Sequence, residues 1–244
     1  MNPRLSTSRV LILATACLWG CSSAPGRPKS DSIHLDPDQN LNFGSLFSQN
    51  CAGCHGPDGK GGPAMALDDP VYLAIANDSV LRGVTTDGDG TAMPAFAKSA
   101  GGMLTDQQID VIVRGMRERW SKPDLFSEII PPPYASSTPG DPSRGAQVFG
   151  TYCSSCHGSD GTGGRHAGAI SNGSYLALVS DQDLRTIVIV GRPELGAPDW
   201  RADVAGNPMS PQDVSDVTAW LASLRPKLPG QPYSTAFNSK GEIQ

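Results

Sequence analysis

The chain has 244 residues, of which 38% are hydrophobic, 18% are charged and 49 are glycine or proline. This composition excludes a coiled coil, a polytopic membrane protein and, because it lacks a Gly-X-Y period, collagen. A formal net charge of −5 argues against a nucleic-acid partner, and six cysteines are too few for a disulfide scaffold at this length.

Residues 1–20 have the features of an export signal, with Arg4 and Arg9 ahead of a short apolar segment. The segment ends in Leu18-Trp19-Gly20-Cys21, which resembles a bacterial lipobox, where a lipid is attached to the cysteine. The alternative is a secreted protein with a free thiol at Cys21. We predict a lipid on Cys21, which would anchor the exported chain to a bacterial membrane, facing the periplasm or the cell exterior.

Two copies of one repeat follow, at a spacing of 102 residues. Residues 21–40 are rich in Ser, Pro and Asp and are interpreted as a flexible tether ahead of the first copy. We therefore predict two domains, at 41–120 and 143–226, joined by a Pro-rich linker at 121–142 and followed by a polar tail at 227–244.

Each copy ends in a pattern typical of a helix. The segments Thr105–Gln108 and Ser210–Asp213 have the residues of a helix N-terminal cap. Apolar side chains recur at helical spacing after each cap, at Ile109, Ile112, Val113, Met116 and Trp120 in the first copy and at Val214, Val217, Leu221 and Leu224 in the second. A phenylalanine, Phe47 or Phe149, precedes the first cysteine of each copy by four residues.

Both copies contain the motif Cys-x-x-Cys-His, formed by Cys51, Cys54 and His55 in the first and by Cys153, Cys156 and His157 in the second. This spacing is the attachment signature of c-type haem, in which two thiols form thioether bonds to the haem vinyl groups and the histidine ligates the iron. A redox-active thiol pair and a zinc site are the alternatives. Against them, the cysteines lie in separate repeats, each pair is followed by His, and neither motif follows a strand. The motifs predict two covalently bound haem c groups.

With these motifs, each repeat resembles a class I cytochrome c domain, and together they resemble tandem dihaem cytochromes c over nearly all of residues 41–226. The resemblance implies an all-α fold of two small helical bundles, each around a covalently bound haem. It also implies a methionine as the usual sixth iron ligand. Met93, in Thr91-Ala92-Met93-Pro94-Ala95-Phe96, matches that pattern, whereas Met65, Met103 and Met116 are interpreted as packing residues.

The second domain departs from this pattern because Ala197 stands where the first has Met93. Three states of haem 2 compete: ligation by Met209, an open five-coordinate iron, and ligation by His166. Met209 is ranked first because an exchanged ligand loop is simpler than lost ligation, although its position matches that of Leu104, which favours packing. Two arginines at matching positions, Arg82 and Arg185, are interpreted either as partners of haem propionates or as solvated charges.

The leading hypothesis is a dihaem c-type cytochrome that transfers one electron at a time at the membrane surface, with no catalytic residue of its own. Its expected partners are redox proteins or a respiratory or photosynthetic membrane complex. The alternative is a dihaem enzyme, peroxidase-like or acting on sulfur compounds, with haem 2 as an open catalytic site.

Overall fold

The structure is a computed structural model that describes residues 36–90, 92–201 and 207–227. The predicted export signal, Cys21 and the polar tail beyond 227 lie outside the described residues. The described residues divide into two units, one that ends at residue 39 and one that begins at residue 40. In the first unit, the described residues form a single 3-10 turn, η2 (Pro37–Gln39).

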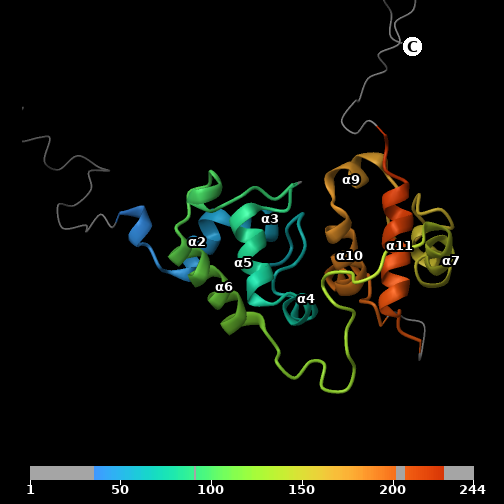
Figure 1. Cartoon of the computed structure of the whole chain (residues 1–244), viewed down its shortest axis with the longest axis horizontal. Helices are drawn as coiled ribbons and strands as arrows, with labels where there is room; N and C mark the ends of the chain where they lie inside the picture. Colours follow the sequence, from blue (N-terminus) through green and yellow to red (C-terminus); the bar gives the residue numbers. More distant parts are fainter. Residues whose placement is uncertain (1–35, 91, 202–206, 228–244) are drawn as a thin grey trace, which may run out of the picture. The chain divides into compact units, whose positions relative to one another are not determined.

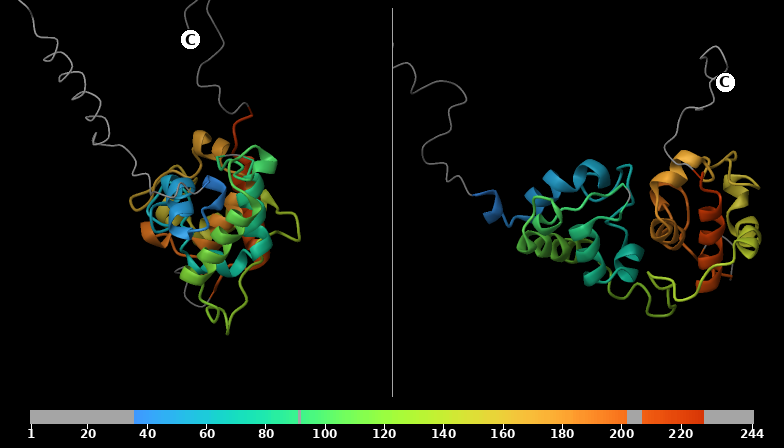
Figure 2. Two further views of the ribbon diagram at one scale, coloured as in Figure 1. Left: turned by 90° about the vertical axis from the view of Figure 1, so that its left-hand side faces the viewer. Right: turned by 45° about the horizontal axis from the view of Figure 1, so that its top comes forward.

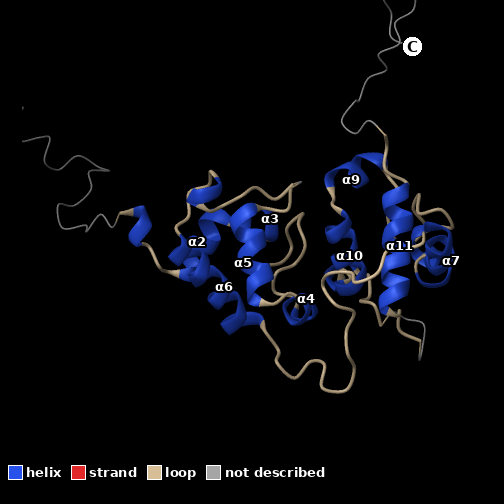
Figure 3. Cartoon of the chain, viewed as in Figure 1, coloured by secondary structure: helices blue, strands red, loops and turns tan. Residues whose placement is uncertain are grey.

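Every regular element in the described part of the chain is helical (Figure 3). The first domain contains α2 (Phe43–Asn50), α3 (Ala52–His55), α4 (Pro70–Ile75), α5 (Asp78–Asp87), η3 (Lys98–Ala100) and α6 (Asp106–Trp120). The second contains α7 (Pro142–Tyr152), α8 (Ser154–His157), α9 (Gly173–Leu178), α10 (Asp181–Val190), η4 (Pro193–Leu195) and α11 (Pro211–Ser223). The same succession of elements occurs twice (Figure 1), so the sequence repeat is also a structural repeat.

The last helix of each domain begins where the sequence predicts. Thr105 and Gln108 form a reciprocal capping box at the start of α6, and Ser210 and Asp213 form one at the start of α11. Each box pairs backbone N–H groups that otherwise have no partner within the helix. The predicted apolar faces are buried, except that Trp120, at the end of α6, is half-buried and Leu224, which follows α11, is 37% exposed.

The first and last helices of the first domain pack through aromatic rings. Trp120 meets Phe43 and Phe47 edge-on, with ring centroids 5.9 and 5.4 Å apart. Gly115 makes room for this contact, because a Cβ there would lie 2.0 Å from the ring of Phe43. This packing places α3, which directly follows α2, beside the core.

In the second domain, α7 lies alongside α11 (Figure 2). The rings of Phe149 and Trp220 are 4.4 Å apart, and a Cβ on Gly145 would lie 2.0 Å from the carbonyl oxygen of Asp216. Arg144 forms ion pairs with Asp213 and Asp216 across the same contact. The close approach therefore depends on a glycine in α7, whereas in the first domain it depends on a glycine in α6.

We expect Gly145→Ala to destabilise the second domain by about 1–3 kcal/mol, because the added methyl group would separate two backbones that are already in contact. Gly150→Ala is the matched control in the same helix, since a Cβ there meets nothing within 4 Å. Urea unfolding of the holoprotein measures both. Equal stability of the two variants would contradict the proposed role of Gly145.

Candidate functional site

The two Cys-x-x-Cys-His motifs fold as single helical turns, α3 and α8, directly after the first helix of each domain. Cys51 ends α2 and caps α3, and the backbone N–H of His55 donates to its carbonyl over 3.0 Å. The backbone N–H of His157 donates to the carbonyl of Cys153 over the same distance. No disulfide joins the four cysteines of the two motifs. Both motifs thus hold two thiols and an imidazole on one short turn.

Each histidine of the motif is held by a backbone carbonyl from the loop that follows. His55 Nδ1 lies 2.8 Å from the carbonyl oxygen of Met65, and His157 Nδ1 lies 2.9 Å from that of Gly168. A carbonyl can only accept, so Nδ1 carries the proton and Nε2 keeps its lone pair for a metal. Burial lowers the pKa of His55, although its bond to Met65 opposes the shift, and this favours the neutral, ligating form.

Glycines bend these loops back onto the motif. Gly56 has φ 84°, and a Cβ there would lie 1.7 Å from the carbonyl oxygen of Lys60. Gly158 has φ 79° and faces the carbonyl oxygen of Gly163 in the same way, at 2.6 Å. Left-handed backbone with no room for a side chain requires glycine. The glycine-rich loops are therefore what brings a carbonyl to each imidazole.

The thiols do not have the electrostatics of a redox-active pair. Burial raises the pKa of both Cys51 and Cys153 to about 11, and the neighbouring Cys54 and Cys156 add to the rise. Reactive Cys-x-x-Cys thiols have lowered pKa values, because the thiolate is the nucleophile. Two thiols on a helical turn, followed by an imidazole with Nε2 available, fit a c-type haem better.

Met93 follows α5 in a tight backbone arrangement. Its N–H donates to Asp89 Oδ1 over 3.0 Å, and its carbonyl oxygen would lie 2.4 Å from a Cβ on Gly88. The Met93 side chain is half-buried. Of the methionines interpreted as packing residues, Met116 is 3% exposed and Met65 packs against the core, but Met103 is 76% exposed, so that interpretation is wrong for Met103.

Ala197 and Pro198 occupy the corresponding place in the second domain. A Cβ on Gly191 would lie 2.3 Å from the carbonyl oxygen of Pro198 and 2.7 Å from that of Ala197. Gly191 directly follows α10, as Gly88 follows α5. Neither Ala197 nor Pro198 has a side-chain atom that can ligate iron.

Met209 holds the place that Leu104 has in the first domain. It is 6% exposed and its N–H donates to the carbonyl of Trp200 over 2.9 Å, while Leu104 is 4% exposed and donates to Phe96 over 2.8 Å. Protein atoms therefore surround Met209 as they surround a core leucine. His166 is exposed, on the loop that carries Gly168. Ligation of haem 2 by Met209 stays a prediction.

The two matching arginines have different surroundings. Arg82 pairs with Asp110 and, at 3.4 Å, with Asp106, and its side chain is 37% exposed. Arg185 is 3% exposed and donates to backbone carbonyls of the linker, so its interpretation as a solvated charge is wrong. The sequence does not predict this role of Arg185, nor the roles of the Met65 and Gly168 carbonyls. Every residue has a backbone carbonyl, so residue types do not indicate which carbonyl will accept a hydrogen bond.

Two family models match the chain. The model for cytochrome c oxidase, cbb3-type, subunit III matches residues 40–114, and the model for cytochrome c matches residues 142–225. The chain therefore belongs to the c-type cytochromes and consists largely of two tandem cytochrome c domains, which confirms the predicted family and all-α fold. Two haem c groups are accordingly its cofactors.

Its curated relatives include subunits of respiratory enzymes. The cbb3-type cytochrome c oxidase subunit FixP of Sinorhizobium medicae is 30% identical over 194 residues, which cover 74% of this chain and 58% of that protein. The subunit CcoP of Azospirillum sp. is 31% identical, covering 57% of this chain and 47% of that protein. The cytochrome bc1 complex cytochrome c subunit of Mycobacterium bovis is 28% identical, covering 60% and 51%. The chain thus spans about half the length of these relatives.

We expect the double variant Cys51→Ala/Cys54→Ala to carry one haem in place of two, because each motif attaches its own group through thioether bonds. Cys153→Ala/Cys156→Ala is the matched change in the other domain. Intact mass after acid-acetone extraction counts the covalent haems. Haem that is extracted from the unaltered protein, or two haems retained by either variant, would contradict this assignment.

Proposed function

We propose that the chain is a dihaem one-electron carrier. The observation that carries this proposal is the repetition, in both domains, of one arrangement: two thiols on a helical turn and an imidazole whose Nδ1 is held by a loop carbonyl. When bound, the iron supplies one-electron chemistry between its ferrous and ferric states. The names of the respiratory relatives support the same class of function, and they do not favour the dihaem-enzyme alternative.

The residues have distinct proposed roles. Cys51 and Cys54, and likewise Cys153 and Cys156, hold the two haems covalently, and His55 and His157 are the proximal iron ligands. The carbonyls of Met65 and Gly168 orient these imidazoles, which fixes the ligating tautomer. Met93 is the proposed sixth ligand in the first domain, and a thioether there raises the reduction potential.

The proposed partner is a respiratory or photosynthetic membrane complex, or a redox protein that serves one. The relatives named above are subunits of a cbb3-type oxidase and of a bc1 complex, which supports a complex of this kind. The net charge of −5 favours a docking partner with a basic surface. None of the described helices has the length and apolar character to cross a bilayer. We propose that a lipid on Cys21 supplies the membrane attachment outside the cytoplasm.

An anaerobic reductive titration tests the carrier function. The holoprotein should take up two electrons per chain in one-electron steps, and a one-electron oxidant should recover both, because each site holds one iron. Absorbance of the haems gives the count. Uptake of a single electron, or turnover of peroxide or thiosulfate by the purified protein, would contradict the proposal.

Conservative replacements test the two proposed methionine ligands. Met93→Leu should change the spectrum of haem 1 and lower its reduction potential, because leucine keeps the volume but lacks the thioether. Met209→Leu should change the spectrum of haem 2 if Met209 ligates the iron. Met116→Leu, in the core of α6, is the control for a buried methionine and should change neither spectrum. An unchanged haem 2 in Met209→Leu removes Met209 as a ligand and leaves it the packing role of Leu104.

A further inference from the structure

Residues 126–141 of the predicted linker, which we call the strap, are fastened along the second domain. Pro132 is fully buried, and Tyr134 packs against the core. A Cβ on Gly140 would lie 2.1 Å from the carbonyl oxygen of Ser215 in α11. Further hydrogen bonds join the strap to α10 and α11: Gln182 to the Tyr134 carbonyl at 2.9 Å, Ser136 to Ser215 at 2.8 Å, Thr138 to Gln212 at 2.7 Å, and the Asp141 N–H to Asp216 at 2.8 Å.

Arg185 is the buried anchor of the strap. Its Nε donates to the carbonyls of Pro133 and Tyr134 at 3.2 and 3.0 Å, and its Nη2 donates to Pro133 at 2.9 Å. Its Nη1 donates to Ser215 Oγ in α11 at 3.1 Å. All these oxygens are uncharged, and burial lowers the pKa of the guanidinium. If the strap moved away, the buried guanidinium would lose its carbonyl acceptors, and a buried charge without partners is costly in free energy. Arg185 therefore favours this one position of the strap.

The strap begins at a second contact, where Phe126 meets Trp200 edge-on with ring centroids 5.1 Å apart. The Arg201 guanidinium lies 5.7 Å from the Phe126 ring centroid and 5.1 Å from that of Trp200. Trp200 is 1% exposed, and its N–H donates to the carbonyl of Ile189 in α10, at the end of the loop that contains Ala197. The part of the linker that remains between α6 and the strap is therefore only residues 121–125.

We propose that the strap, anchored by Arg185, shortens the free connection between the two haem domains and so speeds electron exchange between their irons within one chain. Five extended residues span at most about 18 Å, against about 70 Å for the twenty residues 121–140. Arg185 affects the exchange indirectly, because it holds the strap in place. This proposal rests on the proposed function in one respect, namely that both irons exchange electrons.

The exchange balances without a further reactant. One electron leaves a ferrous iron in one domain, which becomes ferric, and reduces the ferric iron of the other domain. Effective concentration falls roughly as the −3/2 power of the length of a flexible connection, so a fourfold longer free segment lowers it about eightfold when nothing else joins the domains. Because α4 and α10 also contact each other, release of the strap should slow the exchange by up to about that factor.

Two variants release the strap from opposite sides. Arg185→Met removes the anchor without leaving a buried charge, and Gly140→Ala places a methyl group against the backbone of α11. Their matched controls are Arg82→Met, at the corresponding position of the first domain, and Gly150→Ala, where a Cβ meets nothing. Each is prepared as the holoprotein with both haems confirmed by mass. An unaltered haem 2 spectrum shows that the second domain has folded, and either variant alone is sufficient for the test.

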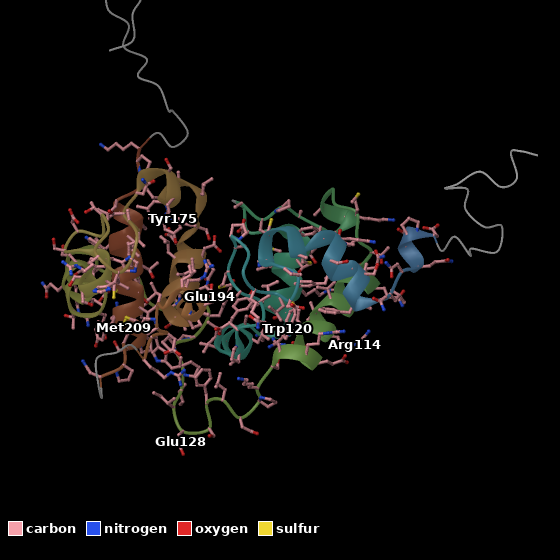
Figure 4. All side chains as sticks on the ribbon, turned by 180° about the vertical axis from the view of Figure 1, so that it is seen from behind. Arg114, Trp120, Glu128, Tyr175, Glu194 and Met209 are labelled. Atoms are coloured by element: carbon pink, nitrogen blue, oxygen red, sulfur yellow. The ribbon has the colours of Figure 1, made fainter. Side chains whose placement is uncertain are left out.

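The first readout needs no electron transfer. Glu128 lies exposed on the strap (Figure 4), and a glutamate-specific protease should cut after it severalfold faster in both strap variants than in the controls. The second readout is the rate at which the two irons equilibrate after fast injection of one electron. The two haems are told apart at wavelengths where the absorbance spectra of the two one-haem cysteine variants differ. We expect a rate independent of protein concentration in the unaltered protein, and a lower one, by up to about eightfold, in both strap variants.

The outcomes separate the proposal from the function on which it rests. Unchanged cleavage at Glu128 in both strap variants would show that the strap is not anchored as proposed. Faster cleavage with an unchanged equilibration rate would overturn the positioning role of Arg185. If the irons of the unaltered protein do not equilibrate, the electron-exchange function fails, whereas slow cleavage at Glu128 would still support the anchored strap.

Discussion

Each domain is organised around the hydrogen bond between the imidazole Nδ1 of its Cys-x-x-Cys-His motif and a carbonyl of the following loop. The bond fixes which nitrogen is available to iron, and it also closes the loop against the motif. The loop can reach the imidazole only because glycines such as Gly56 and Gly158 accept left-handed backbone and leave no side chain at close contacts. Part of the glycine content of the chain therefore serves to hold these two imidazoles in place.

The two domains reach the same arrangement through different helix contacts. In the first, Trp120 packs against two phenylalanine rings and Gly115 makes room. In the second, the contact between α7 and α11 includes Asp216, which is fully buried. Burial alone would raise the pKa of this carboxyl, but hydrogen bonds from the Asp141 N–H and Gln212, with the charge of Arg144, hold it below its usual value. The same aspartate receives the end of the strap, so the helix contact and the strap share one polar group.

The divergence extends to the distal side of each motif. After α5, the tight turn at Gly88 presents a methionine, while the equivalent turn at Gly191 presents an alanine and a proline. The backbone geometry is retained although the methionine is not. The place of Met93, the proposed sixth ligand of the first domain, therefore has no thioether in the second domain, and axial ligands are a principal means of setting haem potentials.

Much of this protein could be predicted from its sequence, because these features depend on residues that lie close together in the chain. The capping boxes at Thr105 and Ser210, the apolar faces of the last helices and the two haem motifs depend on residue types at short spacings. Contacts between distant segments could not be predicted in this way. Arg82 and Arg185 occupy matching positions, yet one forms ion pairs with α6 and the other is buried against linker carbonyls. Met209 shares the buried place of Leu104, which its side-chain chemistry alone does not indicate. The cofactor, the repeat and the last helix of each domain follow from the sequence alone. The tertiary structure alone decided which carbonyls orient the imidazoles and where the linker is fastened, because backbone acceptors are brought together only when the chain has folded.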